Sequence, residues 1–153
     1  MWRVVRKVVL ALGIIGFLPG GGTLASLLVL GLVRVFAPPL YVIGGWLLLL
    51  TGLFLLFAES IEGDPRWCTM DEAVGMLLTL LVMGVFIGEQ WSLWGLEVAG
   101  FLAFRLFDIT KPLLVSCAEK APGMIGVLAD DLVAGVMAGT IISLLYLFVR
   151  VAV

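Results

Sequence analysis

Residues 40–58 read LYVIGGWLLLLTGLFLLFA, a run of nineteen residues without a single charged side chain. A helix rises 1.5 Å per residue, so this run extends about 28 Å and can cross the hydrocarbon core of a membrane. Pro38 and Pro39 precede the run and Glu59 follows it, so both of its ends are marked in the sequence. We predict one membrane-spanning helix here.

The whole chain has the composition of an integral membrane protein. Of its 153 residues, 63% are hydrophobic and 13% are charged, with a mean hydropathy of +1.24, whereas about a quarter of the residues of soluble domains are charged. The length fits one membrane-embedded domain over residues 1–153. We therefore predict an all-α integral membrane protein, built as a small bundle of four to five transmembrane helices.

The first apolar run is too short to be one of those helices. Val8 to Leu18 has eleven residues, against the roughly twenty that span a bilayer. We expect a short N-terminal interfacial or partly inserted helix. No small-residue cleavage pattern follows, so we keep this segment in the mature protein. Because Arg3, Arg6 and Lys7 precede the run, we place the N-terminus in the cytoplasm.

Carboxylates gather at the start of two apolar runs. Residues 64–75 read DPRWCTMDEAVG and place Asp64, Asp71 and Glu72 before one run, and Asp130 and Asp131 open the run from Leu132 to Val149. A solvated loop or a helix cap is the alternative interpretation, although a cap needs one acid and not two.

Two further segments carry groups that can bind an anion. Arg105, Asp108 and Lys111 recur every third residue and share one face if they are helical, where a surface ion-pair ladder is the simpler interpretation. The glycine-rich break from Gly20 to Thr23 precedes a predicted helix over 23–37, whose N-terminal N–H groups could hold an anion. The alternative is a plain helix breaker.

The predicted topology brings these segments to one side of the membrane. If the run 23–37 leads out of the cytoplasm and 40–58 leads back, residues 64–72 are cytoplasmic, the turn at Glu89–Ser92 is external, and residues 105–111 and 130–131 are cytoplasmic again. Only Arg34 and Arg150 then lie toward the other face, as the positive-inside rule expects.

This convergence predicts phosphoryl chemistry. Clustered carboxylates repel one another unless a cation neutralises them, and ligation by oxygen alone favours Mg²⁺ over zinc. Arg105 and Lys111 can take phosphate oxygens. The chain has no histidine, which excludes imidazole-based mechanisms, and its two cysteines, Cys68 and Cys117, form no CxxC pair and are expected to be free thiols.

Four motifs, found in the same order from about Gly20 to Gly139, resemble those of the phosphatidylglycerophosphatase A family. They are the G-T-x-x-S turn (Gly22, Thr23, Ser26), DPxxxxxDExxG (64–75), FRxxDxxKP (104–112) and GxxGxxxDDxxAG (123–135). The resemblance implies a Mg²⁺-dependent phosphatase of the bacterial inner membrane, with its active site facing the cytoplasm. Its substrate would be phosphatidylglycerophosphate, and its products would be phosphatidylglycerol and inorganic phosphate.

The resemblance also assigns roles to individual residues. We expect the acids at two helix starts to hold Mg²⁺, directly or through water, and to be catalytic: Asp71, Glu72, Asp130 and Asp131. Arg105 and Lys111 would grip the phosphomonoester together with Gly22, Thr23 and Ser26. Asp108 would orient Arg105 and Lys111 or act as a base, and both direct attack by water and an aspartyl-phosphate intermediate stay open.

Two other functions stay open at this stage. One is a phosphatase for another phosphomonoester lipid, and the other, from a different class, is a small transporter or channel lined by carboxylates. A transporter would place its acids near mid-membrane, where only Glu97 interrupts an apolar run, and for Glu97 we favour a structural role. We expect no nucleic-acid partner, and the oligomeric state is not readable from the sequence.

Overall fold

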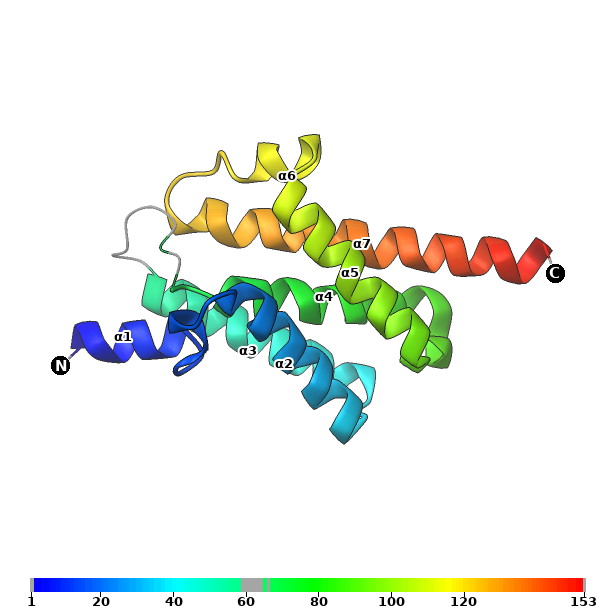
Figure 1. The fold of residues 1–153 in the computed structure, drawn as a ribbon, viewed down its shortest axis with the longest axis horizontal. Coiled ribbons are helices and arrows are strands. Elements are labelled where there is room, and N and C mark those ends of the chain that lie inside the picture. Colours follow the sequence, from blue (N-terminus) through cyan, green and yellow to red (C-terminus); the bar gives the residue numbers. More distant parts are fainter. Residues whose placement is uncertain (1, 59–64, 66, 153) are drawn as a thin grey trace.

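The computed structural model describes residues 2–58, 65 and 67–152. Within these ranges the chain is all helical and contains no strand (Figure 1). Its helices are α1 (Trp2–Leu10), the 3₁₀ turn η1 (Ile15–Phe17), α2 (Gly21–Phe36), α3 (Leu40–Ala58), α4 (Met70–Ile87), the 3₁₀ turn η2 (Gly88–Ser92), α5 (Trp94–Thr110), α6 (Leu113–Ala118) and α7 (Met124–Ala152).

Helix α4 is the centre of the bundle. Helices α2, α3, α5 and α7 all pack against it (Figure 1). Its sequence is apolar around the whole circumference, and a helix of that kind is stable only when it is enclosed. Ala73, Met76, Leu77, Leu80 and Met83 are accordingly buried. The acids at the start of α4 are therefore fixed by the best-packed element of the fold.

A seam of small residues joins α4 to α7. A Cβ atom added at Gly135 would lie 2.5 Å from the carbonyl oxygen of Gly75, and one added at Gly139 would lie 2.7 Å from that of Thr79. The Thr79 hydroxyl donates to the carbonyl oxygen of Gly75 at 3.0 Å and lies 3.4 Å from that of Gly135. The GxxxG spacing of Gly135 and Gly139 thus serves packing within one chain.

Within the described part of the chain, three helices are long and apolar enough to cross a membrane: Leu40–Ala58, the continuous helical stretch Met70–Ser92, and Met124–Ala152. Helix α2, at sixteen residues, is a shorter apolar helix. The chain is thus a membrane protein by its helices, while the predicted count of four to five spans is not confirmed.

The N-terminal segment forms the expected short helix, but this helix spans Trp2–Leu10 and not the predicted run from Val8 to Leu18. Helix α1 has nine residues, which is too few to span a bilayer, and it is followed by a turn and η1. The Leu10 side chain is buried, and its carbonyl oxygen accepts a hydrogen bond from the Thr69 backbone N–H at 3.0 Å. This contact ties the N-terminal segment to the loop that leads into α4.

Two helix boundaries near the predicted site decide how its side chains are placed, and the first differs from the sequence prediction. Helix α7 begins at Met124 and not at Leu132, so Asp130 and Asp131 lie in its second turn and cannot cap it. Helix α5 ends at Thr110, and Lys111 adopts a left-handed conformation (φ 43°) before Pro112, since a residue before proline is pushed out of helical geometry. Lys111 therefore does not continue the helical face of Arg105 and Asp108.

Glu97 has a structural partner, in line with the role that we favoured. Its carboxylate is buried in the first turn of α5, and Arg34 Nη1 lies 3.8 Å from its Oε2 atom. The same Arg34 nitrogen donates to the Ser92 carbonyl oxygen at 3.0 Å. Of the two tryptophans near this turn, Trp91 is buried and Trp94 is exposed.

Candidate active site

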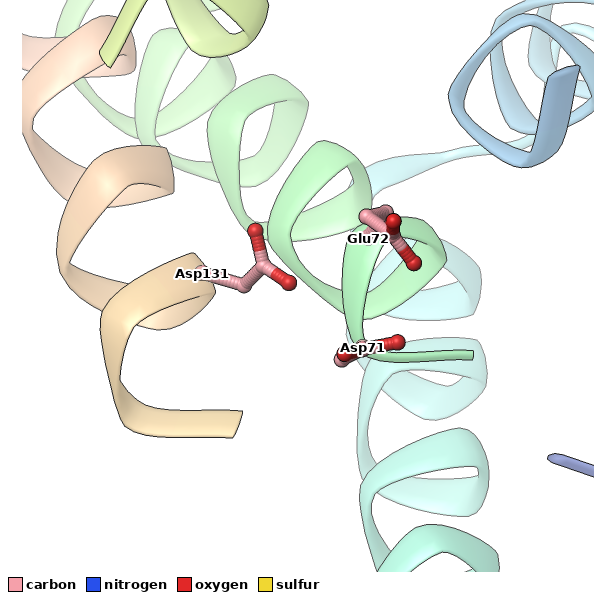
Figure 2. A group of neighbouring side chains, drawn as sticks. All are labelled: Asp71, Glu72 and Asp131. Carbon is pink, nitrogen blue, oxygen red and sulfur yellow. The ribbon is translucent and has the colours of Figure 1, made fainter. Parts of the chain in front are cut away.

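Three carboxylates from two helices meet at one end of the α4–α7 seam. Asp71 and Glu72 lie in the first turn of α4, and Asp131 projects from α7 toward them (Figure 2). Each of the three offers an oxygen, and these oxygens lie within 4.8 Å of one another. Sixty residues of sequence separate Asp71 from Asp131, so the cluster is a product of the fold.

The cluster has the properties of a cation site. Asp71 and Asp131 are each only 3% exposed, and burial of like charges is unfavourable unless protons or a cation neutralise them. Among the described residues, Glu72 Oε2 and Asp131 Oδ1 are buried without a hydrogen-bond partner. Oxygen atoms in this state fit the ligand set of a hard cation such as Mg²⁺ or Ca²⁺.

Glycines hold the carboxylates in place. Gly75 lies one helical turn after Asp71, and Gly135 lies one turn after Asp131. The close contact between the backbones of α4 and α7 is therefore one turn away from the cluster. Gly22, in the first turn of α2, leaves room for the Glu72 side chain, because a Cβ atom at Gly22 would lie 2.0 Å from Glu72 Oε1. The glycine-rich turn and the acidic cluster are thus in direct contact.

A polar cavity of about 720 Å³ opens beside the cluster. The turn from Gly16 to Thr23 forms one wall, Trp67 and Cys68 form another, and Glu72 and Arg105 supply the charges. The first turn of a helix has N–H groups without intrahelical acceptors, and α2 begins at this wall. The cavity therefore combines a guanidinium, helix N–H groups and a carboxylate of the candidate cation site.

Arg105 is held by an ion pair within α5. Its Nη1 atom lies 2.6 Å from Asp108 Oδ2, one turn further along the helix, and both side chains are largely buried. Such a carboxylate fixes the plane of the guanidinium. This contact fits one of the two roles left open for Asp108, that of orienting Arg105.

Lys111 lies between two acids. Its Nζ atom is 2.7 Å from Asp130 Oδ2 and 2.5 Å from Glu119 Oε1. Partial burial lowers the pKa of Lys111, but the hydrogen bonds and charges of Asp130 and Glu119 outweigh burial and raise this pKa above its ordinary value. Lys111 thus stays cationic throughout the physiological pH range.

The structure brings together most of the residues predicted from the sequence, with two differences. Asp130 lies outside the three-carboxylate cluster and bonds to Lys111. Ser26 is fully buried, and its hydroxyl donates to the Gly22 carbonyl oxygen at 3.0 Å, one turn back along α2. Asp64 lies outside the described residues.

Sequence reasoning assigned no role to several residues of this region. Trp67 and Cys68 line the cavity, and Glu119 completes the environment of Lys111. The cation–π contact of Lys7 with the Trp67 ring, at 5.6 Å, joins α1 to the cavity wall. Trp67 and Cys68 lie within the motif 64–75, and this position in the motif could have indicated a role for them. No motif in the sequence includes Glu119.

Comparisons with known proteins agree with the geometry. The family model described as Phosphatidylglycerophosphatase A matches residues 8–146. A protein of Bacteroides thetaiotaomicron named "Putative phosphatidylinositol-3-phosphatase" is 34% identical over 83% of this chain and 82% of its own length. The protein named Phosphatidylglycerophosphatase A of Escherichia coli K12 is 33% identical over 53% of this chain and 42% of its own length. No solved structure matches.

Proposed function

This chain belongs to the phosphatidylglycerophosphatase A family, a family of lipid phosphatases, and we propose that it hydrolyses phosphatidylglycerophosphate to phosphatidylglycerol and inorganic phosphate with Mg²⁺ as its cofactor. Family membership disfavours the transporter or channel that the sequence left open. It leaves the choice between phosphomonoester lipids as the substrate to be tested.

One observation carries the proposal. The three carboxylates have oxygens within 4.8 Å of one another, and one of them, Glu72, lines the cavity that Arg105 and the glycine-rich turn also line. A phosphomonoester needs cationic groups around its oxygens and a positioned water or other nucleophile beside its phosphorus. The described part of the chain places Arg105, N–H groups of the first turn of α2 and one carboxylate of the candidate cation site around one cavity.

We assign the metal to Asp71, Glu72 and Asp131. When bound, Mg²⁺ would neutralise charge on the phosphate and lower the pKa of a bound water. The buried oxygens of Glu72 and Asp131 without hydrogen-bond partners support this assignment. We place Asp130 next to this set, where its bond to Lys111 positions the lysine.

The remaining residues bind and orient the phosphate in this proposal. Arg105, fixed by Asp108, lines the cavity, where its guanidinium would bind phosphate oxygens. The backbone at Gly22 and Thr23 adds N–H donors from the start of α2. Ser26 supports this turn through its bond to Gly22, and Lys111 adds positive charge near the acids.

We also propose where the enzyme works. A single domain over residues 1–153 would lie in the bacterial inner membrane, with the active site at the cytoplasmic face. The support is the distribution of basic residues, of which only Arg34 and Arg150 fall toward the other face in the predicted topology.

The Bacteroides relative makes phosphatidylinositol 3-phosphate the second candidate substrate. Both lipids present a phosphomonoester beyond a phosphodiester, so the same groups could bind either. The test is phosphate release by the purified protein in mixed micelles from each lipid, with Mg²⁺ and with EDTA. We expect Mg²⁺-dependent release with a higher kcat/KM for phosphatidylglycerophosphate. A higher value for the inositol lipid would overturn the substrate assignment, and release from neither would overturn the function.

A further inference from the structure

A second cavity shares α2 and α4 with the polar cavity, and its lining is apolar throughout. It has a volume of about 390 Å³ and lies between α2 and α3, with α4 as its floor. Val29, Ala73 and Leu77 form the buried floor, whereas Leu28, Leu32 and Leu49 stand half-exposed along its rim. It is therefore a groove that opens on the apolar outer surface of the bundle.

The groove begins where the polar cavity ends. Glu72 lines the polar cavity and Ala73, the next residue of α4, lines the groove. On α2, Gly22 and Thr23 line the polar cavity and Val29 lines the groove, about 10 Å further along at 1.5 Å per residue. A lipid of the proposed substrate class has the same order of parts, since a polar headgroup of about that length precedes its acyl chains.

We propose that this groove between α2 and α3 binds an acyl chain of the lipid substrate while its phosphomonoester lies in the polar cavity. This inference rests on the proposed function and adds a second binding site to it. The groove would set the depth at which the substrate enters, and so the position of its phosphate relative to Asp71, Glu72 and Asp131.

The size of the groove favours an alkyl chain over a helix of another protein. One turn of helix, about 10 Å wide and 5.4 Å long, fills roughly 400 Å³, so the groove would hold only a single turn. A methylene group is close in size to a water molecule, of about 30 Å³, so the groove holds roughly a dozen carbons. An extended chain of that length matches most of one fatty acyl chain.

The proposal is tested by a substitution at the rim that fills the groove with a larger side chain. Leu32→Trp places a large side chain in the groove, and because Leu32 is 40% exposed the substitution does not require the core to move. Leu27→Trp is the matched control, since Leu27 lies on the same helix, is 42% exposed and does not line the groove. Both variants and the unaltered enzyme are assayed with dihexanoyl and dioleoyl phosphatidylglycerophosphate.

We expect Leu32→Trp to lower kcat/KM for the dioleoyl lipid about tenfold relative to the dihexanoyl lipid, a factor that loss of about two buried methylene groups already supplies. Leu27→Trp should leave this ratio unchanged. An unchanged ratio in Leu32→Trp, or an equal change in Leu27→Trp, would overturn the proposal. Failure of the unaltered enzyme to hydrolyse even the dihexanoyl lipid would instead count against the proposed function.

A second measurement does not depend on turnover. Phosphatidylglycerophosphate with a diazirine in one acyl chain is photolysed with each protein, and the labelled peptides are mapped by mass spectrometry. We expect labels on α2 and α3 residues of the groove, lost in Leu32→Trp and kept in Leu27→Trp. Labels spread evenly over the outer surface of the bundle in all three proteins would contradict an acyl-chain site.

Discussion

Gly135 of α7 lies against the backbone of Gly75 in α4 so closely that a Cβ atom at Gly135 would be 2.5 Å from the Gly75 carbonyl oxygen. Each glycine follows a candidate metal ligand, Asp71 or Asp131, by one helical turn. The distance between the two helices and the distance between the two carboxylates are therefore set by the same contact. A substitution that disturbs this contact should therefore change both the stability of the bundle and the activity.

Gly135→Ala should separate α4 from α7 and disrupt the carboxylate cluster. Overpacking of a tight contact costs about 1–3 kcal/mol, and a displacement of about 1 Å at a reacting group can cost about 100-fold in rate. We expect both a lower unfolding temperature in detergent and a large loss of phosphate release. Gly52→Ala in α3 is the control, because a Cβ atom there meets nothing within 4 Å. Full activity and stability in Gly135→Ala would contradict this account of the seam.

Gly22→Ala should act on Glu72 alone. The new Cβ atom would lie 2.0 Å from Glu72 Oε1 and must displace that side chain. We expect kcat to fall about 100-fold, with the fold retained because the obstacle is the end of a flexible side chain. Gly31→Ala, on the same helix and without neighbours within 4 Å, should keep its activity and gain up to about 1 kcal/mol of stability. Equal activities of the two variants would rule out this role of Gly22.

Asp130 and Asp131 should differ although they are adjacent. Asp130 bonds to Lys111, whereas Asp131 belongs to the three-carboxylate cluster. We expect Asp130→Asn to retain divalent-cation affinity within about threefold and to raise KM, because the bond that it keeps to Lys111 loses the carboxylate charge and becomes weaker. Calorimetric titration with Mn²⁺ as a probe measures the first effect. A complete loss of binding in Asp130→Asn would return Asp130 to the ligand set.

Arg105 and Asp108 should act as a unit if Asp108 only orients the guanidinium. Their ion pair at 2.6 Å predicts that Arg105→Lys and Asp108→Asn each raise KM about tenfold, since a lysine cannot reproduce the planar fork. The double variant should then be hardly worse than either single one. If Asp108 is instead a base, Asp108→Asn lowers kcat and does so equally in both backgrounds. Arg150→Ala, in the last turn of α7, controls for the loss of a positive charge.

Much of the helical framework follows from local sequence. The uncharged run 40–58 is observed as α3 with the predicted bounds. A short N-terminal helix also forms, although α1 covers Trp2–Leu10 and not the predicted run from Val8 to Leu18. Asp71 and Glu72 lie in the first turn of their helix, as predicted. Hydrophobic periodicity and breaker residues are local signals, so they suffice for these elements.

The differences have non-local causes. Helix α7 extends eight residues further toward the N-terminus than predicted, because Gly126 packs closely on the backbone at Glu119 and Ala121, and Leu128 is buried. The assignment of Asp130 to Lys111 depends on the left-handed turn at Lys111 and on α6, a helix that the sequence did not predict. The contact of Gly22 with Glu72 joins segments fifty residues apart, and only the packed structure contains that information.

The central claim, a metal site formed by Asp71, Glu72 and Asp131 that supports phosphomonoester hydrolysis, is tested most directly by metal restoration. The purified protein is stripped with EDTA, and phosphate release from phosphatidylglycerophosphate is measured as Mg²⁺ is added back to the unaltered protein and to Asp131→Asn. The account predicts no release without metal, saturable recovery in the unaltered protein, and at least about 100-fold less recovery in Asp131→Asn, with the variant still folded. Full activity of the stripped protein, or the same recovery in Asp131→Asn, would contradict it.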